Sequence, residues 1–510
     1  MTPAPAMPWT LYTLLAAAGL PAPGSDPDGT ETADPVITDL QFDSRRVGSG
    51  SLYLAMPGQS THGARFSAAA VEEGAVAVLT DAAGRELAAG VGVPVVVAED
   101  PRGAMAALSV ALNGDPSARV PMFAVTGTNG KTTTVFLLEA ALTALGRTVG
   151  TLGTIGFRLA GEMLERRTST VTTPEAPDLQ ALFAAMADRG ADAIAMEVSS
   201  HALALKRAAG TTFEVAGFTM LGRDHLDFHP DMEDYFAAKA RLFTTGMCRH
   251  AVINTDGEWG ARLAGMVTDV PVTTVGRREG ADVRVLADDP TEDGLGRRVE
   301  LDLAGQQVSF MLPMPGAHNV DNAALALAMV RAAGWDAAAA GVGLERASVP
   351  GRMQRVTLAP RADQDAAPVV IVDFAHTPQA VHEALQAVSV PGRVITVVGA
   401  GGDRDRAKRP LMGEAAGNAS QVVVVTDDNP RTEDPALIRE AVAEGVRDTA
   451  AELHVVDGRR AAIATALRMA GPGDAVMVLG KGHERGQQVG DRVLDFDDVQ
   501  VATEEWENAR

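Results

Sequence analysis

A glycine-rich loop between a predicted strand and a predicted helix limits the folds open to this chain. The loop spans residues 125–134 and reads VTGTNGKTTT. Residues 120–125 are apolar with β character, and residues 135–145 have apolar side chains at helical spacing. Gly127 and Gly130 let backbone N–H groups turn inward around an anion, and the dipole at the start of the helix attracts the same anion. The pattern predicts a nucleotide-binding loop, to which a plain turn is the alternative.

Lys131 and Thr132 follow these glycines directly. A lysine at this place reaches the β- and γ-phosphates of a nucleotide, and the hydroxyl next to it binds Mg²⁺. The usual form of the loop is G-x-x-x-x-G-K-[ST], and Val125 stands where that form has its first glycine. The loop therefore keeps the groups that phosphate binding needs, with one departure in its glycines.

Composition limits the partners of the chain. Its 510 residues suffice for about three domains. The 44 basic and 66 acidic residues give a net charge of −22, which argues against nucleic acid and anionic membranes as partners. The single Cys248 excludes an intramolecular disulfide framework and a cysteine-rich zinc site. No lysine or arginine precedes Arg45 and no apolar run reaches transmembrane length, so we expect a soluble cytoplasmic protein.

Alternating apolar runs and helical stretches predict three α/β domains, at residues 1–115, 116–347 and 348–510. Residues 21–35 are rich in Pro, Gly, Asp and Thr and are predicted to form a loop or flexible insert. Residues 113–117 fit a linker. The phosphate loop opens the second domain, which makes that domain the candidate nucleotide-binding module.

The third domain has four apolar runs separated by helical segments, which predicts a mostly parallel sheet. These runs are 369–372, 394–398, 422–425 and 475–479. A polar cluster follows each of them, and ligands bind such sheets outside the carboxyl ends of the strands. Arg404, Arg406 and Arg431 lie in these clusters and suit carboxylate recognition. Exposed salt bridges are the alternative for at least one of the three.

Three features of the second domain are candidates for chemistry. Glu197 follows an apolar run and could hold Mg²⁺ together with Thr132, or form a surface ion pair. Residues 223–229 contain two histidines and two aspartates, which fits a hard-cation site, a zinc site or a helix-capping loop. Lys239 lies in a short amphipathic helix, and that pattern alone predicts a surface lysine.

The order and content of these motifs resemble the Mur ligases, from residue 43 to residue 484. The motifs are TGTNGKT at 126–132, TTPE at 172–175, MEVSSHAL at 196–203, RDHLD at 223–227, GGDRD at 401–405 and DNPR at 428–431. The resemblance implies an α/β protein of three domains. These are an N-terminal domain for the UDP end of the substrate, a central P-loop ATPase with a parallel-rich sheet, and a C-terminal Rossmann-like domain for the incoming amino acid.

The implied reaction is ATP-dependent amide formation in peptidoglycan precursor synthesis. ATP phosphorylates the D-Glu carboxylate of UDP-MurNAc-L-Ala-D-Glu, and the amine of a diamino acid attacks the acyl phosphate. The products are the UDP-MurNAc-tripeptide, ADP and phosphate. ATP and Mg²⁺ are the implied cofactors, and the resemblance suggests a monomer.

The resemblance also assigns roles by position. The catalytic residues would be Lys131, Glu197, His225 and Lys239. ATP would contact Gly127, Thr128, Asn129, Gly130, Lys131, Thr132, Thr133, Arg352 and Asp373, and its adenine side would contact Asn254, Asn319 and Asn322. The UDP substrate would contact Ser44 and Arg45 through its uridine, and Thr172, Thr173, Ser199 and Arg207 through its muramoyl dipeptide. The amino acid would contact Arg404, Asp428, Asn429, Arg431, Gly480 and Glu484. Metal ions would bind Thr132, Glu197, His225 and a carbamate formed on Lys239.

The form DNPR predicts meso-diaminopimelate as the added amino acid, because Arg431 would pair with its distal carboxylate. L-Lysine and L-ornithine are the alternatives. Four positions depart from the family pattern, namely His318, Gln354, Ala400 and Leu205, and the last two lie near predicted substrate pockets. More distant alternatives are a ligase of the folylpolyglutamate-synthetase type and a nucleotide-binding regulator without catalysis.

Overall fold

The computed structural model describes residues 8–22, 33–58, 61–164, 172–226, 228–360 and 366–508. Most of the loop predicted at 21–35 lies outside these residues, and so does Asp227. The chain divides into two compact units. The first contains residues 1–131, 146–274 and 332–335, and the second contains 132–145, 275–331 and 336–510.

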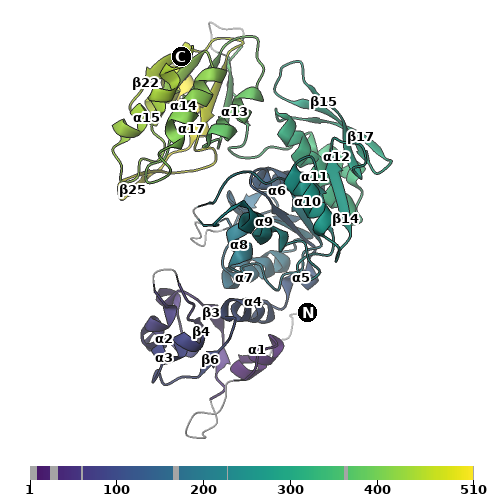
Figure 1. Ribbon diagram of the computed structural model, residues 1–510, viewed down its shortest axis with the longest axis vertical. Coiled ribbons are helices and arrows are strands. Elements are labelled where there is room, and N and C mark those ends of the chain that lie inside the picture. The colour runs from purple at the N-terminus through teal and green to yellow at the C-terminus, as the bar shows by residue number, and fades with distance from the viewer. Residues whose placement is uncertain are drawn as a thin grey trace. The chain divides into compact units, whose positions relative to one another are not determined.

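The first unit begins with a parallel sheet of four strands (Figure 1, purple to blue). The strands lie in chain order as β3 (Asp39–Gln41), β4 (Ser51–Leu54), β5 (Ala75–Thr80) and β6 (Val95–Val97). Its helices are α1 (Leu11–Ala17), α2 (Ser67–Glu72), α3 (Ala82–Leu87) and α4 (Pro101–Leu112). Leu11, Leu52 and Leu108 lie in the core of this sheet and its helices. The predicted linker falls between α4 and α5 (Pro116–Arg119).

The same unit contains a second sheet, in which β7 (Met122–Thr126) is central and fully buried. The strand order is β10-β9-β8-β11-β7-β12-β13-β14. The neighbours β8 and β11, β11 and β7, β7 and β12, and β12 and β13 are parallel to each other. The other strands are β8 (Val149–Gly153), β9 (Gly156–Leu159), β10 (Glu162–Met163), β11 (Ala193–Glu197), β12 (Val215–Phe218), β13 (Ala251–Asn254) and β14 (Val272–Gly276). The helices are α7 (Ala176–Asp188), α8 (Ser200–Ala204), α9 (Met232–Ala240) and α10 (Glu258–Met266). The predicted strand before the glycine-rich loop is confirmed.

The second unit begins with α6 (Lys131–Ala144), the helix predicted after that loop. The last two residues of β14 belong to this unit, and they pair in parallel with β15 (Val283–Pro290). Strand β15 then forms an antiparallel meander with β16 (Arg297–Leu303) and β17 (Gln307–Leu312). Next come α11 (Ala317–Ala332) and α12 (Ala337–Leu344). Every residue of α11 from Asn319 to Val330 except Asp321 is buried, which suits a helix that is apolar around most of its circumference.

The rest of the second unit is a doubly wound sheet of order β18-β19-β23-β20-β21-β22. The strands are β18 (Gln354–Val356), β19 (Val369–Asp373), β20 (Val394–Val398), β21 (Val422–Val425), β22 (Glu452–Val455) and β23 (Ala475–Leu479). Only β18 is antiparallel to its neighbour, so the prediction of a mostly parallel sheet is confirmed. A hairpin of β24 (Gln487–Val489) and β25 (Arg492–Leu494) follows.

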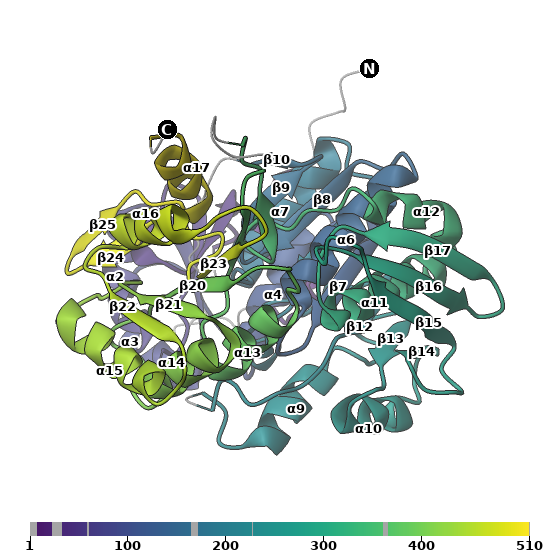
Figure 2. The same cartoon turned by 90° about the horizontal axis from the view of Figure 1, so that it is seen from above.

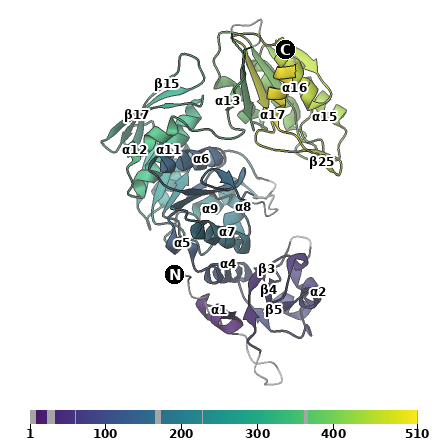
Figure 3. The same ribbon diagram turned by 180° about the vertical axis from the view of Figure 1, so that it is seen from behind.

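Helices cover both faces of this sheet. On one face lie α13 (Pro378–Gln386), α14 (Lys408–Ala419) and α15 (Pro435–Arg447); on the other lie α16 (Arg459–Met469) and α17 (Asp498–Asn508) (Figures 2 and 3). The side chains of β21 alternate between these faces: Val423 packs with α13 to α15, and Val424 packs with α16 and α17. The α/β fold class is confirmed. Among the described residues, no helix has the length and apolar character needed to cross a membrane.

Candidate active site

The glycine-rich loop turns sharply after β7. Gly127 has a φ of 149° and Gly130 a φ of 85°, which are conformations that favour glycine. A Cβ on Gly127 would lie 1.9 Å from the hydroxyl oxygen of Thr219. That hydroxyl donates a hydrogen bond of 2.6 Å to the carbonyl oxygen of Asn129 and so fixes the loop. The start of α6 buries two further predicted residues, Thr132 and Thr133.

Lys131 and Lys239 direct their amines at one carbonyl oxygen. The Nζ of Lys131 donates to the oxygens of Gly127 and Thr128 at 2.9 and 2.8 Å, and the Nζ of Lys239 donates to the oxygen of Gly127 at 2.8 Å. Burial, and then the charge of Lys131, lower the pKa of Lys239 well below its ordinary value. The charge of Lys131 at the start of α6 makes the loop attractive to phosphate.

The surface position predicted for Lys239 from its helix is wrong, because its side chain is only 1% exposed. Tyr235 lies four residues earlier on the same face of α9 and is also buried. The Nζ of Lys239 lies 4.6 Å from the centre of the Tyr235 ring. The polar end of this face meets the phosphate loop instead of solvent.

Glu197 ends β11, opposite Val125 of the neighbouring strand β7. Its side chain is buried, and its two carboxylate oxygens accept hydrogen bonds of 2.8 and 3.0 Å from the backbone N–H and hydroxyl of Thr154. A Cβ on Gly153 would lie 2.2 Å from the carboxylate, so a side chain at this position would displace the Glu197 carboxylate from its place. The carboxylate is therefore a fixed, buried oxygen donor rather than a surface ion pair, and hard oxygen donors suit Mg²⁺.

Three histidines gather near α8. The ring of His201 lies 5.0 Å from that of His225 and 5.8 Å from that of His229. His229 is buried between Asp234 (2.7 Å) and Ser200 (2.9 Å), which gives it structural partners. His225 is 40% exposed and has a left-handed backbone with a φ of 54°. Among the described residues, no three His, Cys, Asp or Glu side chains are grouped to hold a metal ion.

The residues predicted to contact the muramoyl dipeptide lie beside Glu197. The hydroxyl of Thr173 donates to the carbonyl oxygen of Glu197 at 3.0 Å. Arg207 donates to the Thr173 carbonyl at 3.1 Å and pairs with Glu175 at 3.0 Å, and Arg102 pairs with the same carboxylate at 3.2 Å. The backbone N–H of Ser199 donates to the hydroxyl of Thr173, and the hydroxyl of Thr172 lies 3.4 Å from that of Thr154.

The predicted uridine residues Ser44 and Arg45 lie on a 3-10 turn of the N-terminal sheet, η1 (Ser44–Arg46). Arg45 is exposed and pairs with Asp43 at 2.7 Å. The next residue, Arg46, pairs with Asp178 of α7 at 3.1 Å. This contact ties the turn to the helix that follows the TTPE motif.

The predicted adenine-side asparagines have structural partners of their own. Asn319 and Asn322 lie buried on α11 of the second unit. The side-chain amide of Asn319 donates to the carbonyl of Pro315 at 2.7 Å, and Thr134 donates to Asn322 at 3.4 Å. Asn254 ends β13 in the first unit, where its side-chain oxygen accepts a hydrogen bond of 3.0 Å from the backbone N–H of Asp256 in the following turn.

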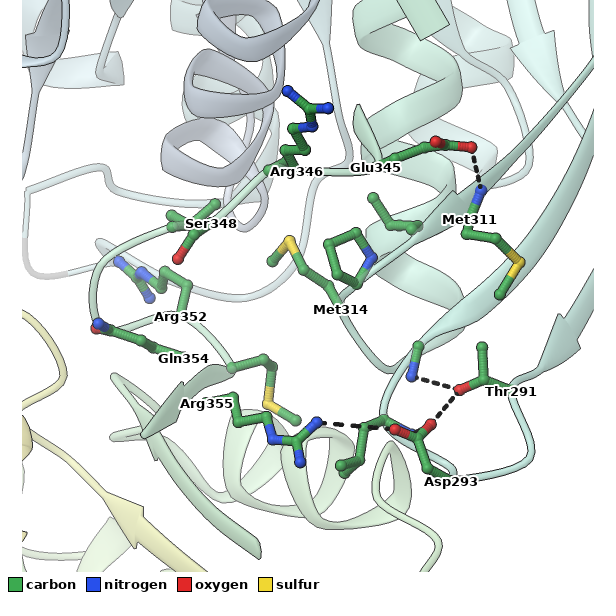
Figure 4. A pocket seen from close by; sticks show the side chains of 17 residues that line it. Thr291, Asp293, Met311, Met314, Glu345, Arg346, Ser348, Arg352, Gln354 and Arg355 are labelled. Atoms are coloured by element: carbon green, nitrogen blue, oxygen red, sulfur yellow. Dashed lines mark hydrogen bonds and ion pairs between the residues drawn. The ribbon is translucent and has the colours of Figure 1, made fainter. Parts of the chain in front are cut away.

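Arg352 lines a cavity of about 440 Å³ beside residues 345–355 (Figure 4). Its guanidinium carbon lies 4.3 Å from the centre of the Phe374 ring. Asp373 is buried and accepts hydrogen bonds from the backbone N–H groups of Met353 (2.7 Å) and Ala375 (2.8 Å), and burial raises its pKa. These contacts join the start of the third domain to the end of β19.

The four predicted polar clusters of the third domain meet at one edge of the sheet, because β19, β23, β20 and β21 are adjacent and parallel. Asn429 donates to Glu484 at 2.8 Å, and Lys481 donates to the Asn429 oxygen at 3.2 Å and to Glu484 at 3.1 Å. Burial raises the pKa of Asp428, and the glycine at 480 has a φ of 116°. Sequence reasoning missed Lys481, which is fully buried, although it stands between Gly480 and Glu484.

The three arginines of these clusters differ. Arg406 is 75% exposed and pairs with Glu433 at 3.0 Å, so the salt-bridge alternative applies to it. The guanidinium of Arg431 donates to the carbonyl of Gly402 at 2.5 Å, and its backbone is left-handed with a φ of 51°. Arg404 is exposed on the loop that follows β20.

Three family descriptions match the chain along its length. "Mur ligase family, catalytic domain" matches residues 36–111, "Mur ligase middle domain" matches 125–330, and "Mur ligase, glutamate ligase domain" matches 351–482. The chain therefore belongs to the Mur ligase family, as its motifs predicted.

Individual relatives agree with this assignment. The chain is 42% identical, over 93% of both sequences, to a UDP-N-acetylmuramoyl-L-alanyl-D-glutamate–2,6-diaminopimelate ligase of Streptomyces avermitilis. It is 42% identical to a UDP-N-acetylmuramyl-tripeptide synthetase of Leifsonia xyli, covering 97% of this chain and 96% of the relative. A solved structure of a UDP-N-acetylmuramoyl-L-alanyl-D-glutamate–2,6-diaminopimelate ligase superposes with a TM-score of 0.69 at 29% identity and covers 99% of both chains.

Proposed function

We propose that this chain is an ATP-dependent ligase that adds meso-diaminopimelate to UDP-MurNAc-L-Ala-D-Glu, giving the UDP-MurNAc-tripeptide, ADP and phosphate. One observation carries the ligase chemistry: the buried amine of Lys239 shares the Gly127 carbonyl of the phosphate loop with Lys131. Lys131 at the start of α6 suits the transfer of a phosphoryl group, in which negative charge must be neutralised, and Lys239 lies close enough to take part. The names of the relatives support the same reaction.

The reaction proceeds in two steps. An oxygen of the D-Glu carboxylate takes the γ-phosphoryl group, and ADP leaves. The amine of the amino acid then attacks the acyl carbon, and the tetrahedral intermediate loses phosphate and a proton to give the amide. In this scheme Lys131 neutralises charge on the transferred group, and Arg207 and Thr173 orient the muramoyl dipeptide next to Glu197.

We assign Mg²⁺ to oxygen and imidazole donors of the central domain, namely Thr132, Glu197, His225 and Lys239 as its carbamate. The fixed, buried carboxylate of Glu197 fits such a cation. When bound, Mg²⁺ supplies charge neutralisation for the phosphates. A lysine whose pKa is lowered keeps more of its amine neutral, and a neutral amine is the form that reacts with CO₂ to give a carbamate.

The domains proposed for these roles are residues 1–115 for the UDP end, 116–347 for ATP and 348–510 for the amino acid. Arg431 supports diaminopimelate, because a guanidinium pairs with a distal carboxylate that L-lysine and L-ornithine lack. The name of the Leifsonia relative leaves the amino acid open, so these two remain the alternatives. We place the protein in the cytoplasm, where its precursor substrates are made, and expect a monomer.

The test is phosphate release from ATP with Mg²⁺ and UDP-MurNAc-L-Ala-D-Glu, with meso-diaminopimelate, L-lysine or L-ornithine added in turn. We expect release with diaminopimelate alone. Release with L-lysine or L-ornithine instead would keep the ligase and contradict the role of Arg431. A chain that releases phosphate with none of the three is not this ligase, and a folylpolyglutamate-type ligase or a silent nucleotide binder would then be preferred.

A further inference from the structure

Two loops at the carboxyl edge of the third sheet are held face to face. One loop spans 401–406 after β20, and the other spans 428–433 after β21. The backbone N–H of Gly402 donates to the carbonyl of Asn429 at 2.9 Å. A Cβ on Gly402 would lie 1.9 Å from the carbonyl oxygen of Pro430, so the two backbones touch with no room for a side chain. These loops carry Arg404 and Arg431.

Glu433 fastens the two loops together from the second one. Its carboxylate accepts a hydrogen bond of 2.6 Å from the backbone N–H of Asp403 in the first loop. It also accepts two hydrogen bonds from the guanidinium of Arg409, at 2.8 and 3.2 Å. Arg409 is 4% exposed on α14 and lies 3.3 Å from the carbonyl of Gly401. The pair is bidentate and shielded, which is the strong geometry for an arginine and a carboxylate.

Asp403 and Arg431 need such support because of their backbones. Both residues are left-handed, with φ of 52° and 51°, and left-handed backbones are unfavourable for residues with a side chain. The carboxylate of Asp403 is held by the hydroxyl of Thr432 at 2.9 Å, and the guanidinium of Arg431 is held by the carbonyl of Gly402 at 2.5 Å. Each strained residue therefore depends on a contact from the opposite loop.

The Glu433 carboxylate keeps its charge at neutral pH. Its hydrogen bonds with Arg409, and then with the backbone of Asp403, lower its pKa to about 2. The Glu433 carboxylate that joins the two loops, called the clamp below, is therefore ionised throughout the pH range in which the enzyme would be assayed.

We infer that Glu433 is a positioning residue for the amino-acid substrate, because it fixes the 401–406 loop against Arg431 and so holds the Arg431 guanidinium at one place. The substrate group concerned is the distal carboxylate of the diamino acid. This inference rests on the proposed function and adds to it a residue that does not itself contact substrate.

The experiment compares the full chain with Glu433→Gln and Thr432→Val, which remove the clamp charge and the Asp403 contact respectively. The KM values for the amino acid, for ATP and for UDP-MurNAc-L-Ala-D-Glu are measured together with the melting temperature. We expect Glu433→Gln to raise the KM for the amino acid about tenfold or more and to change the KM for ATP less than about twofold, because small misplacements at a site are costly. Thr432→Val should shift the same constant in the same direction by less.

Asp474→Asn is the matched control. The carboxylate of Asp474 also accepts hydrogen bonds from an arginine, from the guanidinium of Arg393 at 2.9 Å and from its backbone N–H at 2.7 Å. Asp474 directly precedes β23, however, and so lies at the opposite edge of the sheet. We expect Asp474→Asn to leave the KM for the amino acid unchanged.

Three results would overturn the inference: equal changes in all three KM values, no change in the KM for the amino acid in Glu433→Gln, or a change of the same size in Asp474→Asn. If Glu433→Gln fails to fold, Thr432→Val decides, and an unchanged KM for the amino acid in that variant counts against the clamp. A wild type that is inactive with every amino acid would contradict the proposed function itself. That failure is recognised before any variant is compared.

Discussion

Lys239 keeps its amine 2.8 Å from the Gly127 carbonyl although nearly all of its surface is buried. If the carbamate of Lys239 binds Mg²⁺ there, Lys239→Ala removes the anion that holds the cation. The phosphates then lose the positive charge that Mg²⁺ supplies. We expect the kcat for phosphate release to fall by about 10²–10³, which is typical for the loss of one electrostatic contact to a transition state. Small carboxylates such as acetate should restore part of the rate.

The control for this prediction is Lys206→Ala. Lys206 belongs to the same unit, is 44% exposed and pairs with Asp100. Its replacement should leave kcat unchanged. Wild-type turnover in Lys239→Ala would contradict the proposed role, and a loss of turnover that no carboxylate relieves would argue against the carbamate.

Single residues show where sequence patterns stop being informative. The glycine loop, Glu197 and the cluster with Asn429 were predicted, because their residue types follow strands in a recognisable order. The burial of Lys239 was not, since a lysine on a short helix gives the same pattern whether it meets solvent or a carbonyl group. The clamp residue Glu433 gave no signal either, because its partners come from a loop and a helix far away in the sequence.

At the level of secondary-structure elements, a buried ion pair joins the last two helices. Arg459 begins α16 and Asp498 begins α17; they pair at 2.7 Å with both side chains fully buried. Asp498→Asn leaves the guanidinium buried without its countercharge. We expect it to reduce the free energy of unfolding by about 3–5 kcal/mol, as breaking buried pairs does. Urea unfolding of the two proteins measures the difference.

Glu504→Gln is the comparison on the same two helices. Glu504 pairs with Arg460 at 2.8 Å, but both side chains are exposed to solvent, by 38% and 48%. Its loss should cost less than about 1 kcal/mol, the usual range for surface pairs. Equal losses in Asp498→Asn and Glu504→Gln would mean that burial of the Arg459 pair does not matter for stability.

Strands were predictable according to their place in the sheet. The runs that became β19, β20, β21 and β23 are buried on both faces and read as continuous apolar segments. The edge strand β22 reads ELHV and is half exposed, so its composition does not distinguish it from a loop. The edge strand β18 is only three residues long and has the same ambiguity.

For the whole molecule, nucleotide binding should appear as stabilisation, because a ligand that binds only the folded chain shifts unfolding by mass action. ADP with Mg²⁺ at about a hundred times its Kd should add about 2.7 kcal/mol to the wild type. Lys131→Met should lose most of this gain, and Lys206→Ala should keep it. The measurement is the unfolding midpoint with and without nucleotide, and an equal gain in Lys131→Met would contradict the phosphate role of Lys131.

The place of β23 has a consequence for biosynthesis. This strand lies between β19 and β20, yet it leaves the ribosome after both of them and after β21 and β22. At about 5–20 residues per second, the nascent chain spends several seconds with two apolar strand edges unpaired. Those edges are open to wrong partners during that interval. The edge that carries Gly480 and Glu484 is completed last, so a chain whose synthesis ends before β23 contains the phosphate loop and Arg431 but lacks Gly480 and Glu484 of the proposed amino-acid site.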